Sequence, residues 1–185
     1  TCSAGRGTKE RTKLFAPHSG GDLTFLHPPY GPDTYANVNE GLAVEQENLK
    51  RPTMAETASL VHAAFNSDDS YSTEIKHTMR QTWLWAFTGT LFVPKEGAFI
   101  QDYPETRNGM PFMDKSDLEQ KLNANDPNVR FVPFGYPVGE MTPAQLAQNA
   151  YAIELAGEEG AEKLAEVAEK FRDKPYLHSF ESVDE

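Results

Sequence analysis

The sequence predicts an α+β fold with a small antiparallel or mixed sheet and several packed helices. Stretches in which apolar residues recur every three or four positions, as on one face of a helix, are interleaved with stretches in which they recur every second position, as in a strand. Several helical stretches open with a capping residue. No internal repeat is found in the 185 residues, a length typical of one domain.

The chain is predicted to divide at residue 52. Residues 1–52 contain closely spaced glycines and prolines, such as Gly20, Gly21 and Pro28, and show little periodicity. Such a stretch is typical of an extended arm or a long, loop-rich segment. Residues 53–185 carry the regular patterns and are predicted to form the α+β domain.

Two helices are predicted at the start of this domain. Thr53 and Glu56 have the spacing of a capping box, in which each side chain accepts a hydrogen bond from the backbone amide of the other residue. Apolar side chains then follow at helical spacing, at Met54, Ala58, Val61 and Phe65. A second helix is predicted to begin near Ser72 and to run through Met79.

A buried strand is predicted over residues 83–93. Side chains alternate there between two faces, and both faces are largely apolar, which is typical of a strand that lies between two layers. Residues 94–97 are predicted to turn, because they combine proline and glycine with two charged residues. Residues 98–101 would then return as the partner strand of a hairpin.

The rest of the domain is predicted to alternate between helix and strand. Ser116 and Glu119 indicate another capping box, and residues 129–134 are strand-like until Pro133 forces an edge or an end. Thr142 begins a further helix, with proline at the first helical position and glutamine at the third. The last helix is predicted from the apolar spacing of Ala161, Leu164, Ala168 and Phe171.

Composition excludes several classes of function. The 17 Lys and Arg against 28 Asp and Glu give a formal net charge of −11. This charge argues against binding to nucleic acid, which requires a concentrated basic surface, and against docking on anionic lipid. No apolar run approaches the roughly 18 residues that span a bilayer, so no membrane insertion is expected. A single cysteine excludes an internal disulfide.

Candidate catalytic groups are few. Thr1 has the chemistry of an N-terminal nucleophile and Cys2 that of a reactive thiol. His18, Ser19 and Asp22 are the residue types of a hydrolytic triad, but triad groups normally come from separate elements, whereas these three share one glycine-rich loop. A small hydrolase that uses His18 or Asp22 therefore stands only as a minor alternative, and no catalytic residue is assigned.

The sequence assigns no metal site and no cofactor. His62 and His77 fall on separate predicted helices and lack the spacing of a zinc-binding pair, while Asp68, Asp69 and Asp102 show no EF-hand spacing. Phosphate-loop and dinucleotide-binding motifs are absent from the sequence. The indoles at 83 and 85 are suited to stacking on a sugar, but their spacing on an apolar strand favours a place in the core.

Several long blocks of the chain carry a family resemblance. They are TASLVHAAF (57–65), WLWAFTGTLFVPKEGAFIQDYPE (83–105), VRFVPFGYPVGEMTPAQLAQNAYAIELAGEEGAEKLAEVAEKF (129–171) and PYLHSFESVDE (175–185). Through these blocks the chain resembles the archaeal variable proteins of diversity-generating retroelements. The resemblance implies a C-type lectin-like scaffold that displays a hypervariable surface for an unknown protein or glycan ligand, without enzymatic activity.

The resemblance also implies a C-terminal segment rich in Tyr, Asp, Asn, Arg, Gly and Ser. The sequence stops at Glu185, where that segment is expected to begin, so the expectation is that it is missing from this sequence or was lost. No ligand-binding residue is therefore carried over. The calcium-binding triplets of lectins are also missing, and residues 126–128 are only a near match. The main alternative is a viral or other structural protein in which residues 1–52 wrap a neighbouring subunit.

Overall fold

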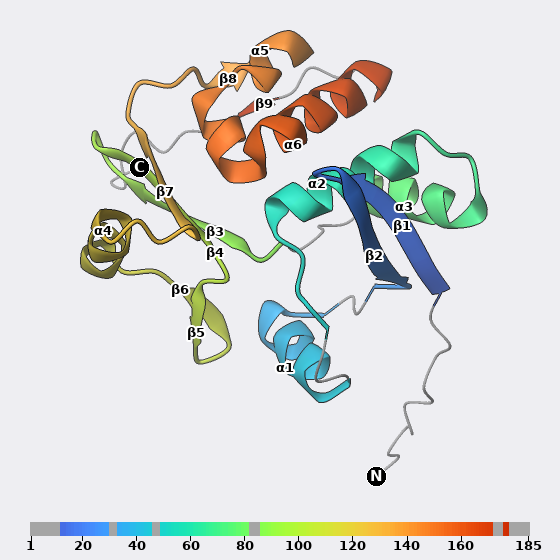
Figure 1. Ribbon diagram of the computed structural model, residues 1–185, viewed down its shortest axis with the longest axis horizontal. Coiled ribbons are helices and arrows are strands. Elements are labelled where there is room, and N and C mark those ends of the chain that lie inside the picture. Colours follow the sequence, from blue (N-terminus) through green and yellow to red (C-terminus); the bar gives the residue numbers. More distant parts are fainter. Residues whose placement is uncertain (1–11, 30–32, 46–48, 82–85, 172–175, 178–185) are drawn as a thin grey trace.

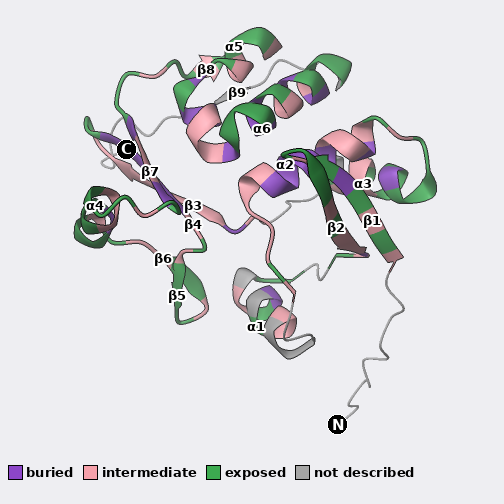
Figure 2. Ribbon diagram, viewed as in Figure 1, coloured by how far each residue is buried: buried purple, intermediate pink, exposed green. Residues whose placement is uncertain are grey.

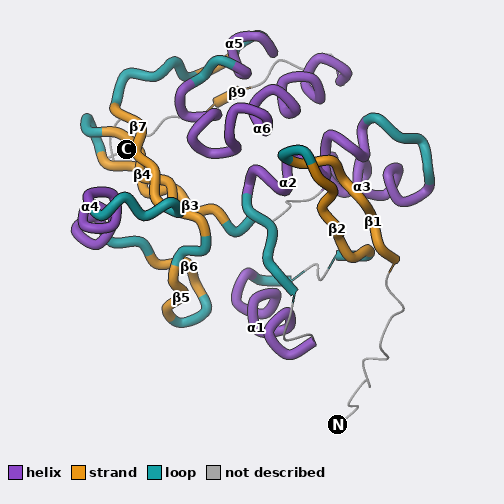
Figure 3. Tube along the Cα trace, viewed as in Figure 1, coloured by secondary structure: helices purple, strands orange, loops and turns teal. Residues whose placement is uncertain are grey.

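The structure is a computed structural model that describes residues 12–29, 33–45, 49–81, 86–171 and 176–177 (Figure 1). It confirms the α+β class, with small antiparallel sheets and several helices. A three-stranded sheet covered by helices forms one side of the molecule, and a helical layer that carries a β-hairpin forms the other (Figures 1 and 3). Thr1, Cys2, Trp83 and Trp85 lie outside the described residues.

The main sheet has the order β3-β4-β7 and is antiparallel throughout. Its strands are β3 (Thr88–Val93), β4 (Gly97–Asp102) and β7 (Val129–Pro133). The predicted turn and return strand are confirmed, since Val93 pairs with Gly97. The strand at 129–134 is confirmed as well, and it ends at Pro133 on the edge of the sheet.

The prediction of a buried strand over 83–93 is corrected in two respects. Within the described residues the strand begins at Thr88, and every residue of β3 is only half-buried. The buried strand is β4, in which all residues but Asp102 are buried (Figure 2). The reason is position in the sheet, because β4 has a neighbouring strand on each side, whereas β3 is an edge strand.

Helices cover both faces of this sheet. On one face, Ile100 and Val132 pack with Tyr151 of α6 (Ala150–Phe171). On the other face, Phe99 packs with Leu118 of α4 (Lys115–Asn123). Because successive residues of β4 point to opposite faces, this one strand contributes to both cores.

The start of α4 differs from the prediction. Its capping residue is Asp114 and not Ser116. The carboxylate of Asp114 accepts a hydrogen bond from the backbone amide of Asp117 at 3.0 Å. Asp114 has the extended backbone of a cap (φ −118°, ψ 130°). Ser116 and Glu119 are already inside the helix, so they cannot form the predicted capping box.

The second layer is built on α2 (Met54–Phe65) and α3 (Ser70–Gln81). The capping box of Thr53 and Glu56 is confirmed, with both hydrogen bonds present. The helix predicted from Ser72 begins two residues earlier, because the carboxylate of Asp69 accepts hydrogen bonds from the amide and the hydroxyl of Ser72.

Residues 1–52 are more regular than predicted. They contain the hairpin β1 (Thr12–His18)–β2 (Gly21–His27) and the helix α1 (Tyr35–Glu45), and the hairpin lies against α2 (Figure 3). Ser19 and Gly20 link the two strands with φ values of 48° and 79°, as the favoured two-residue hairpin turn requires. An extended, loop-rich arm is therefore wrong for residues 12–27 and 35–45, while the domain boundary at residue 52 stays a prediction.

The remaining elements surround the sheet. They are β5 (Glu105–Arg107), β6 (Met110–Phe112), β8 (Gly139–Glu140), α5 (Pro143–Ala147) and β9 (Tyr176–Leu177). The helix start at Thr142 is confirmed as a capping box with proline in the first turn. The predicted last helix is the second half of α6, which breaks at Gly157 (φ 77°, ψ 162°). Among the helices that the structure describes, none has the length and apolar character needed to cross a bilayer.

Candidate functional site

The structure separates the three residues of the candidate triad. His18 Nδ1 lies 2.9 Å from the hydroxyl of Ser59 on α2, whereas Ser19 donates its amide to Glu159 on α6 at 3.0 Å. Asp22 is exposed on β2. The histidine and the serine of this candidate triad therefore have different partners, and they do not bond each other.

His18 belongs instead to a partly buried group that resembles a catalytic serine–lysine pair. The hydroxyl oxygen of Ser59 accepts a hydrogen bond from Lys163 Nζ at 2.9 Å, and the same ammonium donates to the carbonyl of Pro17 at 2.7 Å. Lys163 is also 2.6 Å from the carboxylate of Glu159, and this hydrogen bond holds the pKa of Glu159 below its ordinary value.

This group is arranged to hold the hairpin on the helices. Ser59 is only 1% exposed, so its oxygen has no route to a substrate, and Lys163 is engaged in an ion pair with Glu159. Through Lys163, the group connects β1 with α2 and α6. We therefore assign it a structural role.

His62 and Asp102, two of the residues considered for a metal site, have separate partners, and so does His27. His62 lies 2.5 Å from Glu166 and the buried His27 lies 3.1 Å from Glu74. Asp102 forms a two-point ion pair with Arg130. Within the described part of the chain, no group of three or more His, Cys, Asp or Glu residues is placed to hold a metal ion.

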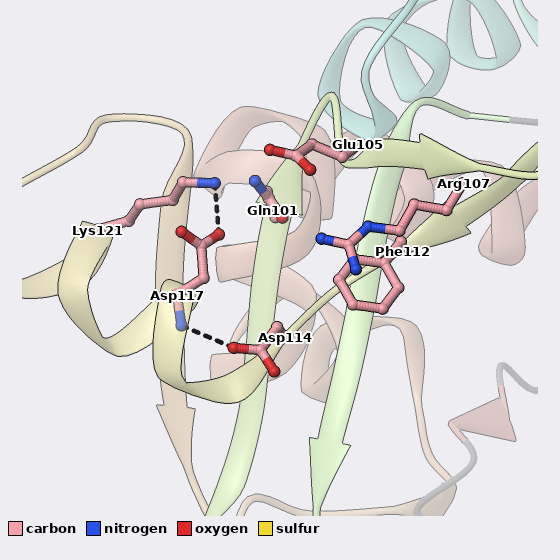
Figure 4. Close-up of a pocket in the computed structure, with 7 residues that line it drawn as sticks. All are labelled: Gln101, Glu105, Arg107, Phe112, Asp114, Asp117 and Lys121. Atoms are coloured by element: carbon pink, nitrogen blue, oxygen red, sulfur yellow. Dashed lines mark hydrogen bonds and ion pairs between the residues drawn. The ribbon is translucent and has the colours of Figure 1, made fainter.

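A polar cavity of about 380 Å³ lies where β4, the hairpin β5–β6 and α4 meet (Figure 4). The three elements are consecutive in the chain, so residues 101–121 supply the whole wall. The lining residues are Gln101, Glu105, Arg107, Phe112, Asp114, Asp117 and Lys121. This volume lies near the lower end of the range for small-molecule sites.

The hairpin that forms one wall is fixed at its tip. Asn108 and Gly109 have φ values of 53° and 75°, the conformation of a two-residue hairpin turn. The turn lies so close to α1 that a side-chain carbon at Gly109 would be 2.5 Å from the Cβ atom of Ala36. Glycine is therefore required there for both conformation and space.

Gln101 forms the floor of the cavity. It is 7% exposed and pairs with Gly89 and Val129 along the sheet, on the same face as Phe99. Its side-chain amide lines the cavity and forms no hydrogen bond with any residue that the structure describes (Figure 4). The amide atoms are reached from the cavity and are not fully enclosed, so they are available to bond a ligand there.

The charged residues of the wall are of two kinds. Asp117 and Lys121 form an ion pair at 2.7 Å, which raises the pKa of Lys121, and Asp114 is occupied in capping α4. Glu105 and Arg107 form no ion pair with a described residue. The guanidinium of Arg107 lies 3.5 Å from the centre of the Phe112 ring, so stacking holds it in place.

Comparisons with known proteins give no relative. No protein-family model, no curated protein and no solved structure matches the chain.

No residue of the cavity was predicted from the sequence as a ligand-binding group. Two local features could have indicated the site. Asn108-Gly109 is a strong signal for a hairpin, and Gln101 interrupts an otherwise apolar strand. Neither feature shows that α4 closes the space between them, because that depends on contacts across the fold.

Proposed function

We propose that this protein is a non-enzymatic ligand-binding module built on a C-type lectin-like scaffold, of the kind that displays variable surfaces in diversity-generating retroelements. The observation that carries the proposal is the cavity floored by Gln101. It combines, in one space, the amide of a buried strand residue and two charged side chains, none of which has a hydrogen bond or ion pair with a residue that the structure describes.

The arrangement of the scaffold supports this proposal. The two longest blocks of family resemblance, 83–105 and 129–171, contain β3, β4, β7 and α6, which are the main sheet and the helix that covers one face. The cavity lies on the opposite face, next to α4 and the β5–β6 hairpin. Side chains in short hairpins and loops can vary at little cost to a core of this kind.

The chemistry of the cavity also favours binding. Its polar groups can donate and accept hydrogen bonds from fixed positions, since Arg107 is stacked on Phe112 and Gln101 is held by the central strand. A binding site needs such pre-positioned polar groups around a concave space. Asp114 and Asp117, the other acids of the wall, are already bonded within α4.

A ligand screen tests the proposal. Purified protein is exposed to panels of glycans, short peptides and small polar metabolites, and binding is followed by amide NMR spectra, while the ligands are analysed afterwards by mass spectrometry. We expect at least one class to shift the signals of the cavity and to be recovered unchanged. Chemical conversion of a bound compound, or the lack of any ligand for the cavity, would contradict the proposal.

The retroelement origin has its own test, which is the DNA around the gene. We expect a near-copy of a stretch of coding sequence that differs from it mainly at adenines, with a reverse-transcriptase gene nearby. If neither is found, the ligand-binding proposal still stands on the cavity, but the link to retroelements is lost.

A further inference from the structure

We propose that the cavity binds a small zwitterion of the α-amino-acid class, with its ammonium group at Glu105 and its carboxylate at Arg107. The inference rests on the proposed function and specifies the ligand. It starts from the two charged side chains of the wall that have no ion pair with a described residue.

The two side chains are placed to act together. Glu105 and Arg107 are two residues apart on β5, so they project from the same side of the strand. Figure 4 shows both directed into the space between the hairpin and α4, with the amide of Gln101 between β5 and the helix. No ion pair within 4 Å joins them, which leaves room for a ligand that contacts both.

The charge of the wall favours a ligand with both signs. Asp117 and Lys121 neutralise each other, and Asp114 is engaged with the first turn of α4. Asp114 keeps its negative charge and Glu105 also attracts Lys121, but Glu105 and Arg107 are the charged side chains of the wall that have no hydrogen bond or ion pair with a described residue. A ligand with a single charge would satisfy one of them and leave the other unpaired, and a neutral sugar would satisfy neither charge.

The remaining groups complete a receptor for this class. The stacked guanidinium keeps its planar fork of donors fixed over Phe112, which is the geometry that binds a carboxylate at two points. The Gln101 amide can donate to the same carboxylate or accept from the ammonium group. The volume of about 380 Å³ accommodates a single amino acid.

The ligand test removes one charge at a time. The full chain is titrated with a pool of the twenty standard amino acids, and NMR follows the Gln101 side-chain amide and the Arg107 Nε–H signal. The amino acid with the largest effect is then compared with its N-acetyl derivative, which lacks the ammonium charge, and with its carboxamide, which lacks the carboxylate. We expect each derivative to bind at least about tenfold more weakly, because each loses one charge-assisted hydrogen bond to the protein.

Matched variants assign each charge to its residue. In Glu105→Gln the amino acid and its N-acetyl derivative should bind equally, because the partner of the ammonium group is gone. In Arg107→Gln the amino acid and its carboxamide should bind equally. Glu162→Gln, which changes an exposed glutamate on α6, is the control and should leave the affinities unchanged.

The outcomes separate this inference from the proposed function. The assignment of a zwitterionic ligand would be overturned if the unchanged protein bound all three compounds equally. It would also be overturned if both variants still distinguished the amino acid from its derivatives as the unchanged protein does. A neutral glycan or singly charged metabolite that moves the Gln101 signal while no amino acid does would also overturn it, and would leave the binding function standing. If no compound of any class moves that signal, both are contradicted.

Discussion

Lys163 offers the sharpest test of how the hairpin is attached. Its side chain is 13% exposed, and its ammonium group donates to the Pro17 carbonyl on β1 and to the Ser59 hydroxyl on α2. Lys163→Met keeps most of the aliphatic stem and removes these donors, so both acceptors lose a charged partner. We expect a clear loss of stability.

The size of the loss follows from the contacts. A hydrogen bond to a charged group contributes about 1.5 to 3 kcal/mol, and we take the lower value for each of the two bonds because water can reach the edge of the group. The ion pair with Glu159 is left out, since that carboxylate is 45% exposed. The free energy of unfolding should fall by about 3 kcal/mol, which lowers the melting temperature by about 6 to 12 °C in a chain of this size.

Urea and thermal unfolding measure this change directly. The matched control is Lys13→Met, which changes an exposed lysine of β1, the strand that Lys163 contacts, and should alter the free energy of unfolding by less than about 0.5 kcal/mol. If Lys163→Met is no more destabilising than this control, the group around Lys163 does not hold the hairpin and the structural role we give it is wrong.

Three other substitutions probe the scaffold. Leu118→Ala, at a fully buried position of α4, should cost about 2 to 5 kcal/mol in urea unfolding, and a loss below 1 kcal/mol would argue against the packing of α4 on the sheet. Gly97→Ala should sharply reduce the yield of folded protein, because φ is 146° and the new carbon would lie 2.0 Å from the Val132 carbonyl; unchanged yield would contradict this turn. Glu159 has a pKa lowered chiefly by its hydrogen bond with Lys163, so its contribution to stability is present above its ordinary value of 4.5 and is lost as the pH falls through the lowered pKa. Glu159→Gln should therefore flatten the stability profile below pH 4.5, and an unaltered profile would refute the assignment.

Local signals in the sequence predicted most of the helix starts. Thr53 and Thr142 were predicted correctly because a capping box depends only on residues three apart. The prediction failed at Ser116, where Asp114, two residues earlier, is an equally suitable cap. Both starts are possible locally, and the structure takes the earlier one.

Features that depend on distant contacts could not be read from the sequence. Residues 88–93 and 97–102 are both rich in apolar side chains, and only the pairing with β7 makes the second strand central and buried. Glu105 and Arg107 are exposed, as local patterns alone predict for charged residues. They face a cavity only because the chain returns from the hairpin to α4.

Gln101→Met is the most direct test of the central claim that the cavity is a ligand site. Methionine keeps the volume of the side chain and removes an amide that has no hydrogen bond with any described residue, so the described part of the fold loses no hydrogen bond. Urea unfolding and ligand titration on the same preparation should show unchanged or slightly higher stability together with binding weakened at least about tenfold. A variant that is clearly less stable, yet binds the ligand as tightly as the unchanged protein, would show that Gln101 serves the scaffold and that the cavity is not the site.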